Sequence, residues 1–312
     1  MPADAFAPDQ WLLVLNPISG RGRGTRHRGE IEALLAAAGM AWRTAVSEYA
    51  GHTTVLVADA VRKGCRRVLV AGGDGSLNEA VNGLFAQDAV PPDAVRLALL
   101  PVGTGNDWGR GHGLRRDARA AVALAARAEA RPHDAGLIEF ADGSRRHFIN
   151  VAGCGFDSTV VDRMPSRRFG RLAYLVGLLR GLAAYRVLPL RLEADGAREE
   201  ISTLVAFACL GRYCGGGMDV APGARTDDGL LDLTVIRHMS PWEILRDLPR
   251  LFDGTLPAHP KVVVKRTGRV VFAGPEGTLL EADGDIVGRL PATLSVLPRA
   301  LRVVLPDLSA VR

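Results

Sequence analysis

The sequence predicts two domains: an α/β domain with a parallel sheet, followed by a β-rich antiparallel sandwich domain. The first is indicated by short aliphatic runs that alternate with amphipathic helical segments over roughly the first 130 residues. The second is indicated by many short strand-like runs between Gly, Pro and Asp turns, which begin after Arg131 and Pro132. A chain of 312 residues that is 47% hydrophobic can bury a core in each domain. We therefore expect domains at residues 1–134 and 135–312.

Each element of the first domain has its own signal. Short aliphatic runs predict strands, Gly39 predicts a helix C-terminus, and Asp117 predicts a helix N-cap. Ser76 precedes Glu79 by three residues, which is the spacing of a capping box and predicts that a helix begins there. The expected strands are 11–15, 42–46, 66–71 and 96–100, and the expected helices are about 26–38, about 52–62, one that opens at Ser76, and about 118–129.

Three glycine-rich loops follow strands of the first domain. The central loop, Gly72 to Gly75, can adopt positive φ and leaves no Cβ between the backbone and a ligand. The helix after it would direct free N–H groups and a positive dipole end at one point, which favours an anion. Asp74 lies inside this loop, where a carboxylate can hold Mg²⁺ against a polyphosphate. Loops 16–24 and 101–110 also follow strands, and because parallel sheets bind ligands at strand ends, the three loops together predict a nucleotide site.

The second domain is expected to consist mainly of strands, with one helical interruption. Residues 167–186 place large apolar side chains among Arg168, Arg171 and Arg180, the pattern of a basic amphipathic helix. Such a helix would either lie on a membrane surface or pack on the sheet, and the sequence leaves both open. The expected strands are 136–140, 147–151, 188–193, 202–210, 230–236, 261–265, 269–272, 278–282, 294–297 and 301–305.

The composition indicates which binding partners and which cellular location to expect. The net charge of +5 suits phosphate-bearing ligands or an anionic membrane, and no arginine run is interleaved with aromatic residues, so no nucleic-acid partner is expected. The four cysteines lack metal-binding spacing and are expected to be small buried residues. Residues 1–10 lack the pattern of a signal peptide, and no apolar stretch reaches the roughly 18–20 residues of a spanning helix. We therefore expect a cytoplasmic protein.

Two acidic turns in the second domain are ambiguous from spacing alone. Asp227 and Asp228 before Gly229 form either a solvated turn or a source of oxygens for a hard cation, and the turn is the simpler interpretation. The acids between Glu281 and Asp285 stand where a strand meets a turn, and they predict a tight hairpin. Neither turn by itself indicates a catalytic function.

Six short motifs, taken together and in order, resemble the catalytic family of diacylglycerol kinases, specifically the soluble bacterial lipid kinases. Each motif is modest alone, but the six run through almost the whole chain. They are Asn16-Pro-x-Ser-Gly-Arg21, Gly72-Gly-Asp-Gly-Ser-x-Asn-Glu79, Pro101-x-Gly-Thr-x-Asn-Asp107, Asn150-x-x-Gly-x-Gly155, Asp227-Asp-Gly-Leu-Leu231 and Asp283-Gly-Asp285.

The resemblance implies a kinase that transfers the γ-phosphoryl of ATP to a lipid hydroxyl, first of all that of diacylglycerol, giving phosphatidic acid. It implies a nucleotide-binding domain similar to those of phosphofructokinases and NAD kinases, followed by a β-rich domain, with the active site in the cleft between the two. The lipid would be met at a membrane surface by a peripherally associated enzyme. The residues that the resemblance places against ATP are Asn16, Pro17, Ser19, Gly20, Arg21, Ser47, Gly72, Gly73, Asp74, Gly75, Ser76, Leu77, Asn78 and Thr104.

The resemblance also implies two magnesium sites. Asp74 and Asp107 would support the catalytic Mg²⁺ beside ATP. Asp228, together with backbone oxygens of Arg225 and Leu230, would form a structural Mg²⁺ site, which replaces the simpler interpretation of that turn.

Asp285 corresponds to the proton acceptor of the family, where Glu is usual. A side chain shorter by one methylene moves the carboxylate by roughly 1.5 Å, and a displacement of that order can cost about 100-fold in rate. Two alternatives therefore stay open: a kinase for another acceptor, such as phosphatidylglycerol, a sphingoid base or NAD, and a lipid- or nucleotide-binding regulator with weak catalysis. An exposed edge strand in the second domain would allow a homodimer.

Overall fold

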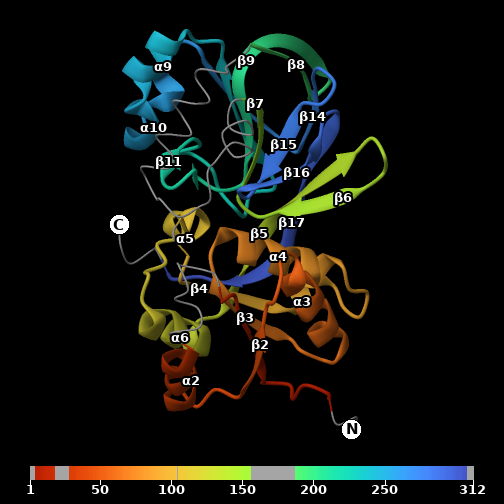
Figure 1. The fold of residues 1–312 in the computed structure, drawn as a ribbon, viewed down its shortest axis with the longest axis vertical. Helices are drawn as coiled ribbons and strands as arrows, with labels where there is room; N and C mark the ends of the chain where they lie inside the picture. Colours follow the sequence, from red (N-terminus) through yellow and green to blue (C-terminus); the bar gives the residue numbers. More distant parts are fainter. Residues whose placement is uncertain (1–3, 18–27, 104, 156–186, 308–312) are drawn as a thin grey trace. The chain divides into compact units, whose positions relative to one another are not determined.

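The computed structural model describes residues 4–17, 28–103, 105–155 and 187–307 (Figure 1). The chain divides into two compact units, Met1–His133 with Arg299–Arg312, and Asp134–Pro298. The first unit has a parallel sheet with helices and the second is built from antiparallel strands, so the predicted fold class is confirmed. The helix predicted at 167–186 lies outside the described residues.

The first unit is built on a parallel sheet. Its strands are β1 (Trp11–Leu15), β2 (Trp42–Val46), β3 (Arg67–Gly72), β4 (Arg96–Pro101) and the end of β17 (Ala292–Val304). The strand order is β2, β1, β3, β4, and then β17, all parallel. From β1 the chain moves to β2 on one side and to β3 on the other. The carboxyl ends of β1 and β3 therefore flank the switch point at which parallel sheets bind ligands.

Helices cover both faces of this sheet (Figure 1). They are α2 (Arg28–Ala37), α3 (His52–Arg62), α4 (Asp74–Phe85), α5 (Asp107–Gly111) and α6 (Ala118–Arg127). Helices α2 and α6 share a core with Leu13 and Leu69, whereas α3 and α4 pack on each other and on β1 and β3. Because side chains alternate along a strand, Leu12 and Val14 point to the opposite face from Leu13. The predicted helices are present, and α5 is an addition.

The end of the chain returns to the first unit, which differs from the predicted extent of the second domain to residue 312. Arg302 and Val303 of β17 pair in parallel with Arg96 and Leu97 of β4. The sequence predicts two separate strands here, because Pro298 and Arg299 interrupt the apolar pattern. In the structure they are one strand, in which Arg299 adopts a φ of 53°.

The second unit is antiparallel. The strands are β5 (Ala130–Phe140), β6 (Arg145–Phe148), β7 (Val151–Gly155), β8 (Leu188–Ala194), β9 (Ala197–Cys209), β10 (Tyr213–Cys214), β11 (Met218–Asp219), β12 (Leu231–Arg237), β13 (Val262–Thr267), β14 (Arg269–Ala273), β15 (Leu279–Ala282) and β16 (Asp285–Arg289). Their main order is β16, β15, β7, β9, β8, β14 and β17, and β12 lies between β9 and β13. Phe148, Leu190 and Phe272 belong to the core that these strands enclose.

Three features of this unit differ from the predicted elements. The single strand predicted at 147–151 is divided into β6 and β7 by a bend at Ile149 and Asn150. Strand β16, where no strand was predicted, forms with β15 the tight hairpin that the acids between Glu281 and Asp285 predict. Two short helices, α9 (Pro241–Asp247) and α10 (Arg250–Asp253), follow β12 where no helix was predicted.

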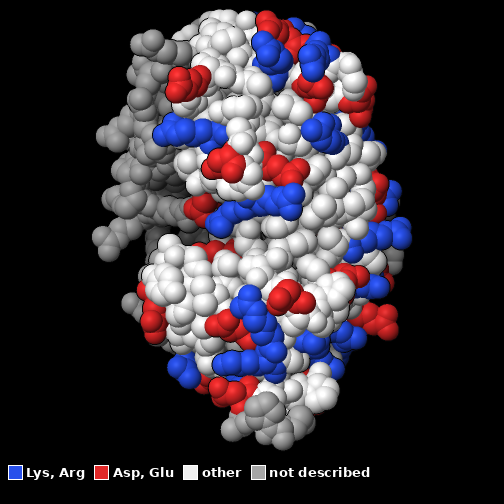
Figure 2. Space-filling model, turned by 90° about the vertical axis from the view of Figure 1, so that its right-hand side faces the viewer, with Lys and Arg blue, Asp and Glu red and all other residues white. Residues whose placement is uncertain are grey.

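Charged side chains of both signs are interspersed on the surface, and the cysteines form no disulfide. Opposite charges face each other across the β8–β9 hairpin, Arg191 with Glu200 and Glu193 with Arg198. On the face shown in Figure 2, basic and acidic side chains are interspersed in the same way. The four cysteines are free thiols, three of them buried. Among the described residues, no helix combines the length and the apolarity needed to cross a bilayer.

Candidate active site

The turn after β3 packs so tightly against its neighbours that some of its positions have room only for glycine. A Cβ at Gly72 would lie 2.4 Å from the Cβ of Ser76, and a Cβ at Gly103 would lie 2.6 Å from the Cα of Gly73. Val102 and Gly103 both donate their N–H groups to the carbonyl oxygen of Gly72, at 3.0 and 3.2 Å. The loops that follow β3 and β4 thus pack backbone against backbone, which requires glycine at these positions.

The loop after β1 joins the same place. Asn16 is the first residue after β1, and its Nδ2 donates to the Oγ of Ser76 at 2.9 Å. Its backbone N–H donates to the carbonyl oxygen of Ala71 at 3.2 Å. The described ends of the three predicted glycine loops therefore lie together at the switch point between β1 and β3.

Asp74 ties the β3 loop to the β4 loop. Its Oδ2 accepts the N–H of Asp107 at 3.0 Å, and its Oδ1 accepts the N–H of Trp108 at 3.1 Å. These are first-turn donors of α5, so Asp74 caps a helix that begins 33 residues later. Burial raises the pKa of the Asp74 carboxyl, although the N–H groups that it accepts oppose this rise.

The capping box predicted from Ser76 and Glu79 is wrong. Helix α4 begins at Asp74, and Glu79 instead accepts the N–H groups of Gly51 and Thr53, at 2.8 and 3.1 Å, at the start of α3. The N-cap residue of α4 is Gly73, which has no side chain that could cap the helix. The first N–H groups of α4, which cannot bond within the helix, are thereby left for another acceptor.

Two carboxylates face one small space beside Gly105. A Cβ at Gly105 would lie 3.2 Å from the Oδ2 of Asp74 and 3.8 Å from the Oδ2 of Asp107. Mg²⁺ prefers oxygen ligands and is commonly held by one or two carboxylates together with waters and substrate phosphates. Asp74 and Asp107 therefore fit the catalytic ion that the family resemblance implies. Within the described part of the chain, no set of three or more metal-binding side chains occurs.

Three rings that the sequence analysis did not single out pack behind the β4 loop. The Nε1–H of Trp108 donates to the Nε2 of His133 at 3.2 Å, and the ring of His112 lies 4.5 Å from that of Trp108. Burial, with the nearby His133, lowers the pKa of His112 to about 3. His112 is therefore neutral near pH 7 and packs against the loop, which argues against a role as a general acid.

The other residues predicted to bind the nucleotide have different surroundings. Ser47 is buried at the end of β2, and its N–H donates to Leu15. The side chain of Leu77 is fully buried, and the Oδ1 of Asn78 accepts a hydrogen bond from Asn82, so the side chains of α4 beyond Ser76 pack inward. Pro17 and Gly75 are half-buried beside the loops, whereas Ser19, Gly20, Arg21 and Thr104 lie outside the described residues.

In the second unit, Asp283 and Gly284 form the two-residue turn between β15 and β16. Both have positive φ, 50° and 92°, as a type I′ turn requires. The carboxylate of Asp283 accepts the N–H groups of residues 149–151 at 2.8, 3.0 and 3.0 Å. Glu281 accepts the N–H of Gly284. These bonds fix the turn and the bend between β6 and β7, and they leave Asp285 as the exposed acid at the start of β16.

The turn at Asp228 is occupied by an arginine. Asp228 accepts the N–H of Leu230 through Oδ1 at 3.1 Å and binds the Nη2 of Arg266 through Oδ2. Arg266 stands directly opposite Asp232 in the β12–β13 ladder, and its Nε lies 3.4 Å from the Oδ1 of Asp232. The side chain of Arg225 pairs with the exposed Asp227 instead.

This arrangement does not fit the structural Mg²⁺ site that the resemblance implies. A guanidinium already neutralises Asp228, and a divalent ion coordinated by its carboxylate and the carbonyl oxygens of Arg225 and Leu230 would have to displace Arg266. We derive no role for a metal at this turn.

Comparison with known families matches both units. Residues 10–138 match the diacylglycerol kinase catalytic domain. Residues 150–305 match the YegS C-terminal NAD kinase beta sandwich-like domain. The two matched segments follow each other in the chain in the same order as the α/β and the antiparallel units.

Individual proteins are similar over nearly the whole chain. A diacylglycerol kinase of Mycobacterium tuberculosis (strain ATCC 25618 / H37Rv) is 35% identical over 298 residues, which cover 94% of each chain. A diacylglycerol kinase of Bacillus subtilis (strain 168) is 29% identical over 298 residues, covering 94% of this chain and 95% of that one. A crystal structure from Bacillus anthracis str. Sterne has a TM-score of 0.80 at 22% identity, covers 98% of this chain and 99% of that one, and shows the shared fold.

The match of the α/β unit to the diacylglycerol kinase catalytic domain, and of the antiparallel unit to the YegS C-terminal domain, identifies a lipid kinase, and this kinase family implies the use of ATP. The chain belongs to the diacylglycerol kinase family. The predicted enzyme class is thus confirmed. The acceptor, the metal ions and the roles of single residues stay predictions.

Proposed function

We propose that this protein transfers the γ-phosphoryl of Mg-ATP to the hydroxyl of diacylglycerol, giving phosphatidic acid. The similarity to proteins named diacylglycerol kinase, 35% and 29% identical over nearly the whole chain, supports this acceptor. The observation that carries the phosphate-binding part is the N-terminus of α4, whose N-cap residue, Gly73, has no side chain to cap the helix. The protein would act in the cytoplasm and associate peripherally with the membrane that holds its substrate.

The triphosphate would bind at the switch point of the first unit. The N–H groups at the start of α4 and the positive end of its dipole favour a phosphate there. The tight packing of Gly73 on Gly103 lets two loop backbones approach the same ligand. Asn16 holds Ser76 in place, and the predicted contacts of Ser19, Gly20, Arg21 and Thr104 would complete the site.

The acids of the first unit would hold the metal ion. Asp74 and Asp107 turn their Oδ2 atoms toward the space beside Gly105, and a bound Mg²⁺ would supply neutralisation of phosphate charge there. Because Asp74 also caps α5, it would keep the β4 loop in register with the β3 loop whether or not the ion is bound. Phosphoryl transfer depends mainly on such positioning and on electrostatic stabilisation.

Asp285 would accept the proton of the lipid hydroxyl as the hydroxyl attacks the γ-phosphorus. It is an exposed acid at the start of β16, whereas Asp283 and Glu281 are buried. A general base of this kind contributes roughly 10²–10⁴-fold to a rate. The Asp at this position, where the family usually has Glu, favours one alternative, a weakly catalytic lipid- or nucleotide-binding regulator.

Phosphorylation assays with radiolabelled ATP test the proposal. Mixed micelles would carry diacylglycerol, phosphatidylglycerol or a sphingoid base in parallel, with NAD as a soluble acceptor. We expect label in phosphatidic acid, and a rate of labelling roughly 10²–10⁴-fold lower with the Asp285→Asn variant. Preferred labelling of another acceptor would reject diacylglycerol as the substrate, and ATP binding without any transfer would support the regulator.

A further inference from the structure

The segment that follows β12 has two apolar faces. Residues 241–253 keep a helical backbone throughout, because Leu248 and Pro249, which separate α9 from α10, also have α-helical φ and ψ. Ile244 is buried, and together with the half-buried Leu251 it packs in a core cluster with β9 and β12 residues. This inner face accounts for the attachment of the segment to the second unit.

The outer face carries large apolar side chains that belong to neither hydrophobic cluster of the described residues in this unit. Trp242 is 77% exposed, Phe252 is 52% exposed and Leu245 is 40% exposed. With the exposed Pro249, these residues stand at positions i, i+3, i+7 and i+10 of one helical path, so they line a single side of it. We call Trp242, Leu245, Pro249 and Phe252 the outer stripe.

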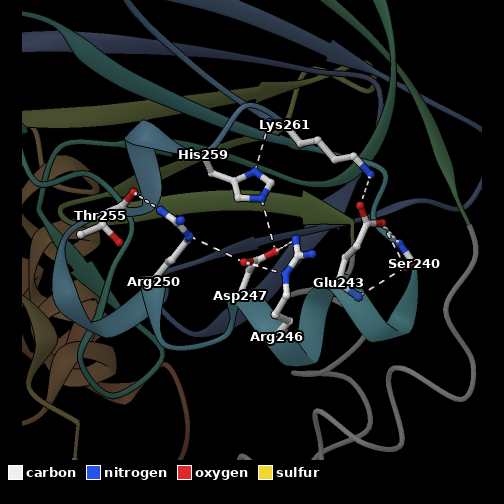
Figure 3. A network of polar contacts seen from close by, with 8 residues as sticks. All are labelled: Ser240, Glu243, Arg246, Asp247, Arg250, Thr255, His259 and Lys261. Carbon is white, nitrogen blue, oxygen red and sulfur yellow. Dashed lines mark hydrogen bonds and ion pairs between the residues drawn. The ribbon is translucent and has the colours of Figure 1, made fainter.

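The acidic groups of this segment are engaged by cations and hydroxyls (Figure 3). Glu243 bonds to Lys261 at 2.6 Å and closes a capping box with Ser240. Asp247 bonds to Arg246 at 2.7 Å and lies 3.3 Å from the Nε2 of His259.

Two arginines flank the stripe on the same segment. The side chains of Arg246 and Arg250 are 64% and 38% exposed, and Arg250 lies 3.7 Å from Asp247. Asp253 accepts the N–H and the hydroxyl of Thr255. The segment therefore combines an apolar stripe with exposed arginines, while each of its carboxylates already has a donor.

We propose that the outer stripe docks this protein on an anionic phospholipid bilayer. Tryptophan prefers the membrane–water interface, and an amphipathic segment with Trp, Phe and Leu beside arginines is typical of interfacial binding. Arg246 and Arg250 complement anionic headgroups. This inference rests on the proposed function, because an enzyme whose acceptor is a membrane lipid must bind a bilayer.

A second copy of the chain fits the stripe less well. Trp242 and Phe252 together expose on the order of 250 Å² at about 150–250 Å² per aromatic ring. A stable dimer buries about 800 Å² on each partner. The two rings of the stripe thus supply about a third of such an interface, whereas insertion into a membrane interface needs only a few large side chains.

Tryptophan fluorescence with phospholipid vesicles tests the docking directly. Of the four tryptophans, all of them described, Trp11 and Trp108 are buried, Trp42 is half-buried, and Trp242 is largely exposed. Vesicles that contain phosphatidylglycerol should shift the emission of the protein to shorter wavelength, and brominated phosphatidylcholine in them should quench it. Neither change should occur with the Trp242→Phe variant.

Sedimentation with the same vesicles compares matched variants. Trp242→Ala with Phe252→Ala should weaken vesicle binding by about ten-fold or more. The control, Val55→Ala with Val264→Ala, removes two other exposed apolar side chains and should bind like the parent protein. Arg246→Gln with Arg250→Gln should reduce binding to phosphatidylglycerol vesicles and leave binding to pure phosphatidylcholine vesicles unchanged.

Two outcomes would overturn the proposal. One is unchanged vesicle binding by the Trp242→Ala, Phe252→Ala variant. The other is a dimer in sedimentation velocity that this variant converts to a monomer, which would assign the stripe to a second copy.

Failure of the proposed function gives a different result. With dispersed dioctanoylglycerol as acceptor, the stripe variant should keep the turnover of the parent protein, and it should lose turnover on vesicle-bound diacylglycerol. If the parent protein phosphorylates neither form but binds vesicles through the stripe, the acceptor is wrong and the docking surface stands.

Discussion

In both units a carboxylate at a glycine turn accepts backbone N–H groups from a segment far away in the sequence. Asp74 of the first unit accepts those of Asp107 and Trp108. Asp283 of the second unit accepts those of residues 149–151. In each unit the acid thereby fixes a neighbouring loop, and the positions of the remaining groups of the turn follow from this attachment.

The two turns differ in what they leave available. The first opens a helix, α4, whose N-cap residue, Gly73, has no side chain to cap it. The second joins two antiparallel strands, its N–H at Gly284 donates to Glu281, and the exposed Asp285 follows at the start of β16. A turn at a helix N-terminus thus offers donors to an anion, whereas a hairpin turn offers a side chain. This difference suits the proposed roles, in which the first unit binds phosphate and the second unit supplies a base.

The largest effect is expected from Asp74→Ala, which breaks the first turn. The change removes the acceptor of two N–H groups and a proposed magnesium ligand, so we expect loss of measurable turnover and a fall of about 2 kcal/mol in the free energy of unfolding. Radiolabel transfer and urea unfolding measure the two effects. Asp74→Asn keeps an acceptor but not the charge, and it should recover part of the stability without turnover. Wild-type turnover in Asp74→Asn would show that the carboxylate acts only as a cap.

Asp285→Asn tests the second turn. We expect turnover to fall by roughly 10²–10⁴-fold, because the amide cannot accept the proton. The unfolding midpoint and ATP binding should not change, since the side chain is exposed. Asp285→Glu, which restores the usual residue of the family, should raise turnover by up to about 100-fold if the shorter side chain misplaces the base. A fully active Asn variant would exclude this role.

Asp283→Ala tests whether Asp283 stabilises the turn that carries the proposed proton acceptor, Asp285. Three buried N–H groups lose their acceptor, so we expect a loss of about 3 kcal/mol in the free energy of unfolding. Denaturant titration measures this loss, with Asp285→Asn as the matched acidic control. Equal stability of the two variants would contradict the comparison, because it would mean that the bend between β6 and β7 does not depend on Asp283.

Glu79→Ala should have a smaller effect, about 1 kcal/mol, because it removes the acceptor at the start of α3. Amide hydrogen exchange can locate the change. We expect faster exchange at Gly51 and Thr53 and no change at the first residues of α4. The reverse pattern would restore the capping box predicted from the sequence.

The smallest expected effect is that of Mg²⁺ on stability without nucleotide. Because Arg266 already neutralises Asp228, exchange of EDTA for Mg²⁺ should leave the unfolding midpoint unchanged. Arg266→Met should lower the midpoint and make it rise with Mg²⁺, since a ligand that binds the folded state stabilises it. Arg225→Met, at an exposed pair, is the control. Stabilisation of the parent protein by Mg²⁺ that Asp228→Asn abolishes and Asp74→Asn retains would show that the ion displaces Arg266.

Local signals predicted the elements that depend on neighbouring residues. Asp117 accepts the N–H groups of Arg119 and Ala120 at the start of α6, as its N-cap position predicts. Gly39 has a φ of 67° just after α2, where a helix stop was predicted. In both cases the helix end and its cap lie within a few residues, so nothing distant competes for the bonds.

Capping boxes were not predicted correctly from spacing: one that was predicted is absent, and one that was not predicted is present. The Ser76–Glu79 spacing predicts a capping box, but α3 packs on α4 and brings Gly51 within reach of the Glu79 carboxylate. Ser240 and Glu243 do form a capping box, in a segment where no helix was predicted. The spacing is the same in the two places, and only the surrounding elements decide which acceptor reaches which donor.

The sequence by itself determined the fold class, the order of the glycine and acid motifs, and through them the family. These features depend on side-chain periodicity and on backbone freedom at single positions, which are local properties. The tertiary structure alone decided that Asp74, Glu79 and Asp283 bind other helices and strands, and that Arg266 neutralises Asp228. Such partners lie between 26 and 134 residues apart in the chain, as for Glu79 with Thr53 and for Asp283 with Ile149. They meet only because the packed core brings their elements together.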